Sequence, residues 1–222
     1  MILSEAMDNQ KNEIKNILFD WGGVITELHL EATKKAFHDL GLSVFDEHIP
    51  HDPLDKVFIP FETGNISADE FRNNIRKFSA NPLTDSMIDG AWNAMLGILP
   101  EERWKLLETI GHSYRTFLLS NTNAIHLNYY FNYLQGIYGT FGYTHLFEKT
   151  YYSHEIHLRK PNADIFEYVV QDSGIKPHET LFIDDFLENI ETARKLGFHT
   201  VHLTKPRTLV DLFKSNRLHL ST

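Results

Sequence analysis

The stretch Phe19–Ile25, with the sequence FDWGGVI, decides how this chain is expected to fold. It closes an apolar run, Ile14–Phe19, of the kind that forms a strand buried on both faces of a parallel sheet. Asp20 then stands at the carboxyl end of that strand, where open α/β sheets bind their ligands. Gly22 and Gly23 allow backbone N–H groups to approach an anion closely. The alternative is an ordinary turn, which also favours Asp and Gly.

Four further strand-like runs follow along the chain, and segments with helical periodicity separate the later ones. We expect strands at Thr116–Ser120, Lys149–Ser153, Thr180–Ile183 and His199–Leu203. We expect helices at Glu101–Ile110, Asn162–Val170, Leu187–Leu196 and Thr208–Phe213. Strands and helices in alternation predict an α/β fold, a doubly wound parallel sheet with right-handed crossovers.

One connection is too long for a simple crossover. Between Asp20 and Thr116 lie 95 residues, whereas a crossover needs about a dozen. This segment has helical stripes of its own, one preceded by a capping box at Ser67 and Glu70 and another by Thr84 as N-cap. Such helices should pack together as a bundle that lies over the strand ends. We therefore expect a helical-bundle cap at 27–97 and an α/β core domain at 12–26 and 98–222.

Composition sets the broad class of protein. The 222 residues fit one domain, or a core with an insertion, and 42% hydrophobic residues can build a packed interior. A formal net charge of −9 argues against a nucleic-acid surface, which needs a basic footprint. The chain has no cysteine, which excludes disulfides and thiolate metal sites. Its thirteen histidines show no ligand spacing, so most are expected at the surface.

The same reading predicts where the protein acts and with what. No apolar run reaches the about 18 residues of a membrane span. Residues 1–16 are polar and lack the apolar region of a signal peptide. We therefore expect a cytoplasmic protein, a monomer or homodimer, with no membrane or nucleic-acid partner.

Two polar clusters follow the first one. Ser120 and Asn121 close a predicted strand, and a hydroxyl with free backbone N–H groups suits phosphate oxygens. The alternative is an N-cap for the next helix. Further along, Lys160 precedes Pro161, which predicts a helix start with proline in the first helical position. A cation is unfavourable there, so Lys160 either faces a negative ligand or is an ordinary solvated lysine.

The last cluster is the pair Asp184 and Asp185, directly after an apolar strand. Adjacent carboxylates repel one another unless a cation compensates, and oxygen ligands suit Mg²⁺. The alternative is that one of them caps the helix from Leu187. Together the four clusters supply a nucleophile, a metal site and fixed donors, which are the parts that phosphoryl transfer needs.

In this order, the four clusters resemble the four motifs of the haloacid dehalogenase (HAD) superfamily of hydrolases. Finer details are similar to the small-cap bacterial phosphatases that include α-D-glucose-1-phosphate phosphatase. These details are FDxGGV, the cap segment Glu62–Phe71, LSNTN with His126, and LRKP. The resemblance implies the sheet order 5-4-1-2-3. It also implies an Mg²⁺-dependent phosphatase of small phosphorylated metabolites, with sugar phosphates favoured.

The resemblance also implies roles for single residues. Asp20 matches the nucleophile that forms an aspartyl-phosphate, and Lys160 matches the catalytic lysine that steadies it. The residues expected at the phosphate are Trp21, Gly22, Ser120, Asn121 and Lys160. The expected Mg²⁺ ligands are Asp20, the carbonyl of Gly22 and Asp185, with Asp184 acting through water. Glu62, in a loop between two cap helices, is the candidate for substrate contact, unless that loop is only a turn.

One position departs from the family pattern. Most phosphatases of the superfamily carry a second aspartate two positions after the nucleophile, where this chain has Gly22. General acid–base help of that kind contributes about 10²–10⁴ in rate. Two alternatives therefore stay open, a 2-haloacid dehalogenase that needs no metal and a non-catalytic phosphate-binding regulatory domain. The acidic pair speaks against the first, and intact Asp20, Lys160 and Asp185 speak against the second.

Overall fold

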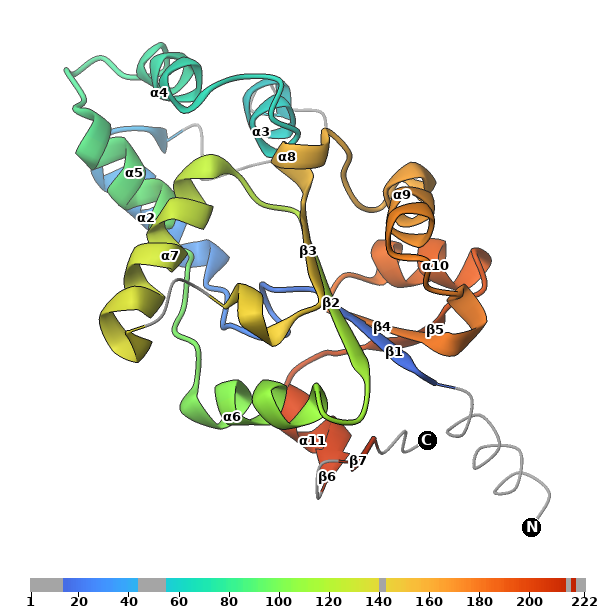
Figure 1. The fold of residues 1–222 in the computed structure, drawn as a ribbon. Helices are drawn as coiled ribbons and strands as arrows, with labels where there is room; N and C mark the ends of the chain where they lie inside the picture. The colour runs from blue at the N-terminus through green and yellow to red at the C-terminus, as the bar shows by residue number, and fades with distance from the viewer. Residues whose placement is uncertain (1–13, 44–54, 140–142, 215–216, 219–222) are drawn as a thin grey trace.

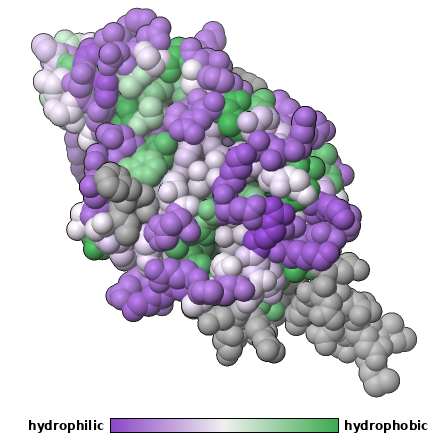
Figure 2. All heavy atoms as spheres, viewed as in Figure 1, coloured by the Kyte–Doolittle hydropathy of each residue, from purple (hydrophilic) through white to green (hydrophobic). Residues whose placement is uncertain are grey.

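The structure is a computed structural model that describes residues 14–43, 55–139, 143–214 and 217–218. Most of the polar N-terminal segment, on which the expected location depends, lies outside these residues. Within them, every helix is too short or too polar to cross a membrane. On the face shown in Figure 2, hydrophobic residues form separate small patches between hydrophilic ones, as is ordinary for a protein surface.

A five-stranded parallel sheet lies at the centre of the core domain (Figure 1). Its strands are β1 (Asn16–Phe19), β2 (Arg115–Ser120), β3 (Lys149–Tyr152), β4 (Thr180–Asp184) and β5 (His199–His202). The order is β3-β2-β1-β4-β5, so the predicted order and the α/β class are confirmed. Strand ends differ from prediction by one or two residues, because ladder pairing sets them rather than apolar composition. The β1 ladder begins where Asn16 pairs with Arg115 and Thr180.

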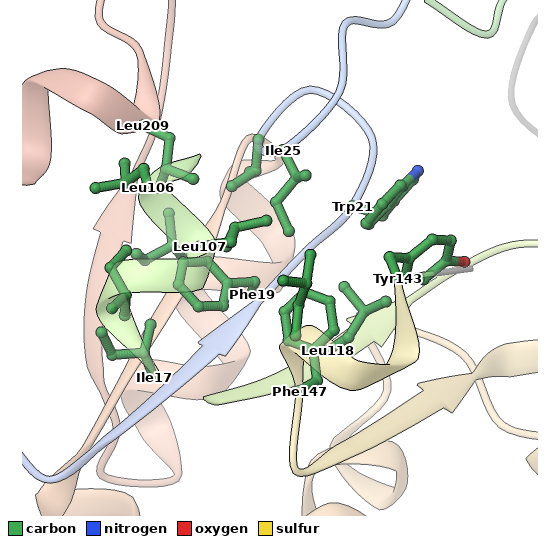
Figure 3. Packing of buried hydrophobic residues seen from close by; sticks show 14 of the residues in the cluster. Ile17, Phe19, Trp21, Ile25, Leu106, Leu107, Leu118, Tyr143, Phe147 and Leu209 are labelled. Atoms are coloured by element: carbon green, nitrogen blue, oxygen red, sulfur yellow. The ribbon is translucent and has the colours of Figure 1, made fainter. Parts of the chain in front are cut away.

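Helices cover both faces of the sheet. One face carries α6 (Glu101–Ile110), α7 (Ala124–Tyr138) and α11 (Leu209–Leu212), and the other carries α9 (Ala163–Ser173) and α10 (Leu187–Lys195). Ile17 and Phe19 point to the first face, where Leu107 and Leu118 meet them (Figure 3). Leu18 points to the second. Both faces are therefore buried, which explains why the strands read as continuous apolar runs.

Helix α7 was given no predicted range, although a helix after Ser120 and Asn121 was one alternative and α7 spans 15 residues. Ile125 packs into the core of the cap, while Tyr130 and Leu134 pack into the core of the sheet domain. A helix with apolar contacts on more than one side has no single stripe, so periodicity does not reveal it.

The predicted helix start at Pro161 is wrong. Helix α9 begins at Ala163, with Asn162 as its N-cap, and Pro161 follows a cis peptide bond. The predicted end is close to the observed one, because Gly174 stops the helix in the left-handed conformation with φ 69°.

The long insertion folds into a small helical cap. Its helices are α2 (Leu30–Asp39), α3 (Asp55–Glu62), α4 (Ala68–Arg76) and α5 (Asp85–Asn93), which lie together at the upper left of Figure 1. The predicted capping box of Ser67 and Glu70 is present, and Thr84 caps α5 as predicted. Their interior is rich in aromatic side chains, among them Phe37, Phe61, Phe71 and Trp92.

Two linkers run side by side between cap and core. Leu28 forms an antiparallel bridge with Leu96, and the Gly97 N–H donates to the carbonyl of Glu27 at 3.0 Å. A Cβ atom at Gly97 would lie 2.6 Å from the Cβ of Glu27. Glycine therefore allows the two linkers to approach closely. The first linker leaves the sheet directly after Asp20 and the second returns from α5 to α6, which brings the cap over Asp20.

Candidate active site

The predicted clusters meet at the carboxyl end of the sheet. Asp20 follows β1, Ser120 ends β2, and Asp184 ends β4. Lys160 arrives from the segment before α9. A cavity of about 590 Å³ opens here between core and cap, and Asp20, Ser120 and Lys160 line it. The parallel sheet thus gathers residues that are far apart in the chain.

Lys160 is buried between two carboxylates, with 1% of its side chain exposed. Its Nζ lies 2.8 Å from Asp20 Oδ1 and donates to Asp184 Oδ2 at 2.7 Å. Burial lowers the pKa of Lys160, but the attraction of Asp184 and Asp20 outweighs it and the net shift is upward. The residue is therefore a paired buried ammonium, and the alternative of a solvated surface lysine is wrong.

The loop after β2 holds Lys160 in place. The side-chain amide of Asn121 donates to the carbonyl of Lys160 and accepts from its N–H, both at 2.9 Å. The amide nitrogen carries two N–H groups and this contact uses one of them, so the phosphate contact expected of Asn121 stays a prediction. The alternative of an N-cap applies to Asn123, whose side chain accepts from the His126 N–H at the start of α7.

Three carboxylates form an acidic cluster beside Lys160. One oxygen each from Asp20, Asp184 and Asp185 lies within 4.8 Å of the others. Asp184 accepts hydrogen bonds on both oxygens, from Lys160, Asn189 and the Phe186 N–H. Asp185 Oδ1, in contrast, is buried without a partner among the described residues. A buried carboxylate oxygen without a donor is suited to a cation.

Burial changes the protonation of this cluster. Desolvation raises the pKa of Asp20 to about 7, although the charge of Lys160 opposes the shift. Desolvation, followed by repulsion from Asp184, raises the pKa of Asp185 to about 6. A divalent cation would favour the ionised forms of both carboxylates.

The turn after Asp20 brings backbone close to this cluster. Gly23 has φ 74°, and a Cβ atom there would lie 2.2 Å from Asp185 Oδ2, so only glycine fits. The N–H groups of Trp21 and Gly22 donate to no protein acceptor in the described ranges, which leaves them available to an anion. The Trp21 ring stacks on Tyr143, with 4.0 Å between ring centroids (Figure 3). That stacking anchors the turn.

The cap completes the cavity. Its apolar wall is formed by Leu28, Leu30, Phe58, Trp92, Met95 and Leu96. The loop after α3 lies on α8 (Ser153–Ile156), where a Cβ at Gly64 would be 2.1 Å from the His154 carbonyl oxygen. The Thr63 carbonyl oxygen is 2.8 Å from His157 Nδ1. Glu62 lines the cavity, and its contact with a substrate stays a prediction.

Comparison with known proteins identifies the family. A model described as haloacid dehalogenase-like hydrolase matches residues 14–197. The chain belongs to this family. It is therefore a hydrolase, and the resemblance seen in the motifs is confirmed.

Individual relatives of this HAD-like hydrolase are phosphatases by name. A D-ribitol-5-phosphate phosphatase from Bacteroides thetaiotaomicron is 32% identical, over 84% of this chain and 90% of its own. A sesquiterpene phosphatase from Aspergillus oryzae is 27% identical, over 86% of this chain and 90% of its own. Among solved structures, a HAD family enzyme from Bacteroides thetaiotaomicron is 36% identical with a TM-score of 0.84, covering 90% of this chain and 99% of its own. That enzyme is an aspartate-to-alanine variant in complex with magnesium and inorganic phosphate.

The sequence of this HAD-like hydrolase did not predict the contacts of two residues in the cavity wall, Arg159 and His126. Arg159 stands beside Lys160 in the sequence, yet its ion pair with Glu62, 97 positions away, had no local signal. His126 received no position of its own in the prediction that most histidines lie at the surface, and it is buried. Its Nε2 lies 3.2 Å from the carbonyl oxygen of Trp92, and burial lowers its pKa to about 4. The neutral ring ties α7 to α5.

Proposed function

We propose that this protein is an Mg²⁺-dependent phosphatase of small phosphorylated metabolites, with sugar and polyol phosphates favoured. The observation that carries the proposal is the buried contact of Lys160 with Asp20, 2.8 Å apart, beside Asp184 and Asp185. A nucleophile, a fixed cation and an acidic metal site together suit phosphoryl transfer. The relative named for ribitol 5-phosphate and the neighbour with bound magnesium and phosphate support the same chemistry.

The residues present fit a magnesium ion. Asp20, Asp185 and the carbonyl of Gly22 are the proposed ligands, and Asp184 acts through water. Asp185 Oδ1 lacks a protein donor among the described residues, whereas Asp184 already accepts from Lys160 and Asn189. When bound, the ion would offset negative charge on the carboxylates and on the phosphoryl oxygens.

Asp20 is the proposed nucleophile. Its oxygen attacks phosphorus while the bond to the leaving oxygen breaks, which gives an aspartyl-phosphate and an alkoxide that takes a proton from solvent. Water then attacks the same phosphorus, the Asp20–phosphorus bond breaks, and inorganic phosphate and a free carboxylate result. Lys160 stays protonated throughout and stabilises negative charge next to it. The Ser120 hydroxyl and the N–H groups of Trp21 and Gly22 donate to the phosphoryl oxygens.

The proposal is tested with the full chain and a panel of phosphate esters. Ribitol 5-phosphate, glucose 1-phosphate and p-nitrophenyl phosphate are assayed with Mg²⁺ and with excess chelator. We expect turnover only with Mg²⁺. Asp20→Asn should lower kcat by at least about 10³-fold, as loss of a catalytic nucleophile does, without changing the melting temperature by more than a few degrees. Asp164→Asn, at an exposed aspartate of α9, is the matched control.

Three outcomes would contradict parts of this proposal. Full activity in excess chelator would contradict the proposed requirement for Mg²⁺. Appreciable turnover by Asp20→Asn, with deamidation excluded by mass spectrometry, would contradict the assignment of Asp20 as the nucleophile. Halide release from a 2-haloacid, without hydrolysis of any phosphate ester, would establish the dehalogenase alternative.

A further inference from the structure

An ion pair in the cavity wall has no part in the chemistry proposed above. Arg159 of the core donates from Nη2 to Glu62 Oε2 of the cap at 3.0 Å. The two side chains are 29% and 24% exposed, and both line the cavity. Arg159 directly precedes Lys160, so the pair lies near the proposed site of phosphoryl transfer in the same cavity.

Arg159 has more donors than this ion pair uses. A guanidinium carries five N–H groups in a planar fork, and the Arg159 Nε is buried without a partner among the described residues. Glu62 is an acceptor with two oxygens, which together can accept several hydrogen bonds. Donors and acceptors therefore stand next to one another, which matches hydroxyl groups because each hydroxyl both donates and accepts.

Other polar groups also line the cavity, among them the Thr122 side chain and the indole N–H of Trp92, which is buried without a partner among the described residues. The cap wall is apolar and suits a carbon skeleton. Thr33 donates to the carbonyl oxygens of Ala91 and Trp92, and Tyr130 donates to Thr26 and Gly97, so these hydroxyl protons are used within the protein. Lys34 pairs with Glu31 on its own helix, whereas Arg159 and Glu62 form an ion pair between core and cap in the cavity wall.

We propose that Arg159 and Glu62 together recognise neighbouring hydroxyl groups on the organic part of a polyol or sugar phosphate, with Arg159 donating and Glu62 accepting. This role rests on the proposed phosphatase function and deepens it. In this proposal, a core residue and a cap residue both select the substrate, because the bound polyol would contact both. A phosphate ester without hydroxyl groups would leave the pair unused.

The test compares two substrates that differ only in hydroxyl groups. Ribitol 5-phosphate and n-pentyl phosphate share a five-carbon skeleton and a primary phosphate ester. We expect the wild-type protein to favour ribitol 5-phosphate in kcat/KM by at least about 10-fold. Arg159→Met and Glu62→Gln should each lower kcat/KM for ribitol 5-phosphate by about 10–100-fold, mainly through KM, because the first removes the donors and the second replaces the carboxylate by a neutral amide. For n-pentyl phosphate the change should stay below about 3-fold.

Matched variants separate recognition from a structural effect. Arg194→Met makes the same chemical change on α10, outside the cavity lining, and should leave both substrates unaffected. Arg159→Lys keeps the charge without the planar fork and should retain only part of the preference for ribitol 5-phosphate. If Arg159→Met does not fold, the substrate ratio of Glu62→Gln decides the question alone.

The possible failures are distinguishable. Equal loss on both substrates would mean that Arg159 positions Lys160, and would overturn the proposal, as would no loss on either. Hydrolysis of n-pentyl phosphate by the wild-type protein without preference for the polyol would overturn this inference and leave the phosphatase function intact. Hydrolysis of no phosphate ester at all would overturn the proposed function and this inference with it.

Discussion

At the scale of single residues, Gly22 and Gly23 are adjacent but differ in what they tolerate. Gly23 has φ 74°, and a Cβ there would collide with Asp185. Gly22 lies outside the left-handed region, and a Cβ there would meet only the Leu28 side chain, at 3.7 Å. A Cβ atom therefore fits at Gly22, where most superfamily phosphatases carry their second aspartate, and does not fit at Gly23.

Restoring a carboxylate at Gly22 should supply the missing proton donor. In the wild-type protein, rates should fall steeply as the leaving-group pKa rises, because no acid protonates the leaving oxygen. Gly22→Asp should raise kcat/KM for alkyl phosphates by up to about 10²-fold. It should change kcat/KM for aryl phosphates little. The measurement is kcat/KM over substrates graded by leaving-group pKa, with Gly22→Asn as the control. A flat dependence in the wild type, with product release shown not to limit the rate, would mean that another group donates the proton.

Gly23→Ala tests the contact with Asp185. Both Gly23→Ala and Gly174→Ala place a side chain at positive φ and should cost about 1–3 kcal/mol in free energy of unfolding. At Gly174, with φ 69°, the new Cβ meets nothing within 4 Å. Only Gly23→Ala displaces Asp185, so it alone should lower kcat/KM, by about 10²-fold or more, since ligand geometry at the metal is lost. Unchanged Mg²⁺ dependence in Gly23→Ala would contradict the assignment of Asp185.

At the scale of elements, α7 connects the cap to the end of β2, where Ser120 is a proposed phosphate ligand. Asn123 caps this helix and lies 3.2 Å from His126 Nδ1, while the opposite ring nitrogen, Nε2, contacts the carbonyl of Trp92 on α5. The His126 ring also stacks on the Trp92 ring, with centroids 4.9 Å apart. The cap position is thus coupled to the loop that carries Ser120.

The buried His126 predicts a loss of stability in acid. Its pKa is about 4 in the folded protein, against 6.5 ordinarily, so between these values the unfolded chain binds more protons. Stability should therefore fall as the pH drops from 6.5 to 4, by up to about 3 kcal/mol from this residue. Denaturant unfolding of wild type and His126→Gln over this range isolates the effect, because other titrating groups are common to both. A constant difference between the two would contradict a neutral His126.

At the scale of the whole molecule, cap and core enclose a cluster of like charges. Asp20, Asp184 and Asp185 lie together in a chain whose formal net charge is already −9, with Lys160 as the buried cation beside them. Folding without a divalent cation therefore places carboxylates where their charged forms are disfavoured. A ligand that binds only the folded state adds to its stability.

Magnesium should stabilise the fold more at high pH than at low pH. The pKa of Asp20 is raised to about 7 and that of Asp185 to about 6, so below these values protons compete with the metal. The rise in Tm on adding Mg²⁺ should be several degrees at about pH 8 and small at about pH 5.5, because binding must release protons there. Asp185→Asn should remove most of the rise. Equal shifts at both pH values would contradict these ligands.

Local sequence sufficed to predict the features that depend on residues close together in the chain. The alternation of strands and helices, the capping box at Ser67 and the N-cap at Thr84 follow from periodicity and from hydrogen bonds spanning three residues. Asp20 and Asp184 were placed at strand ends for the same reason. The four motifs, taken together, also identified the family and with it the order of the sheet.

Packing in three dimensions assigned the rest. Helix α7 contacts both cap and core, so its sequence shows no stripe. Local sequence left two alternatives for Lys160, a negative ligand or solvent, and only the strands that bring two carboxylates to it decide that it is buried. The pairing of Arg159 with Glu62 joins positions 97 residues apart. Such contacts depend on how the cap sits on the sheet, which is set by the combined packing of many side chains. No local pattern of residues encodes that placement, because periodicity and capping act only within a few residues.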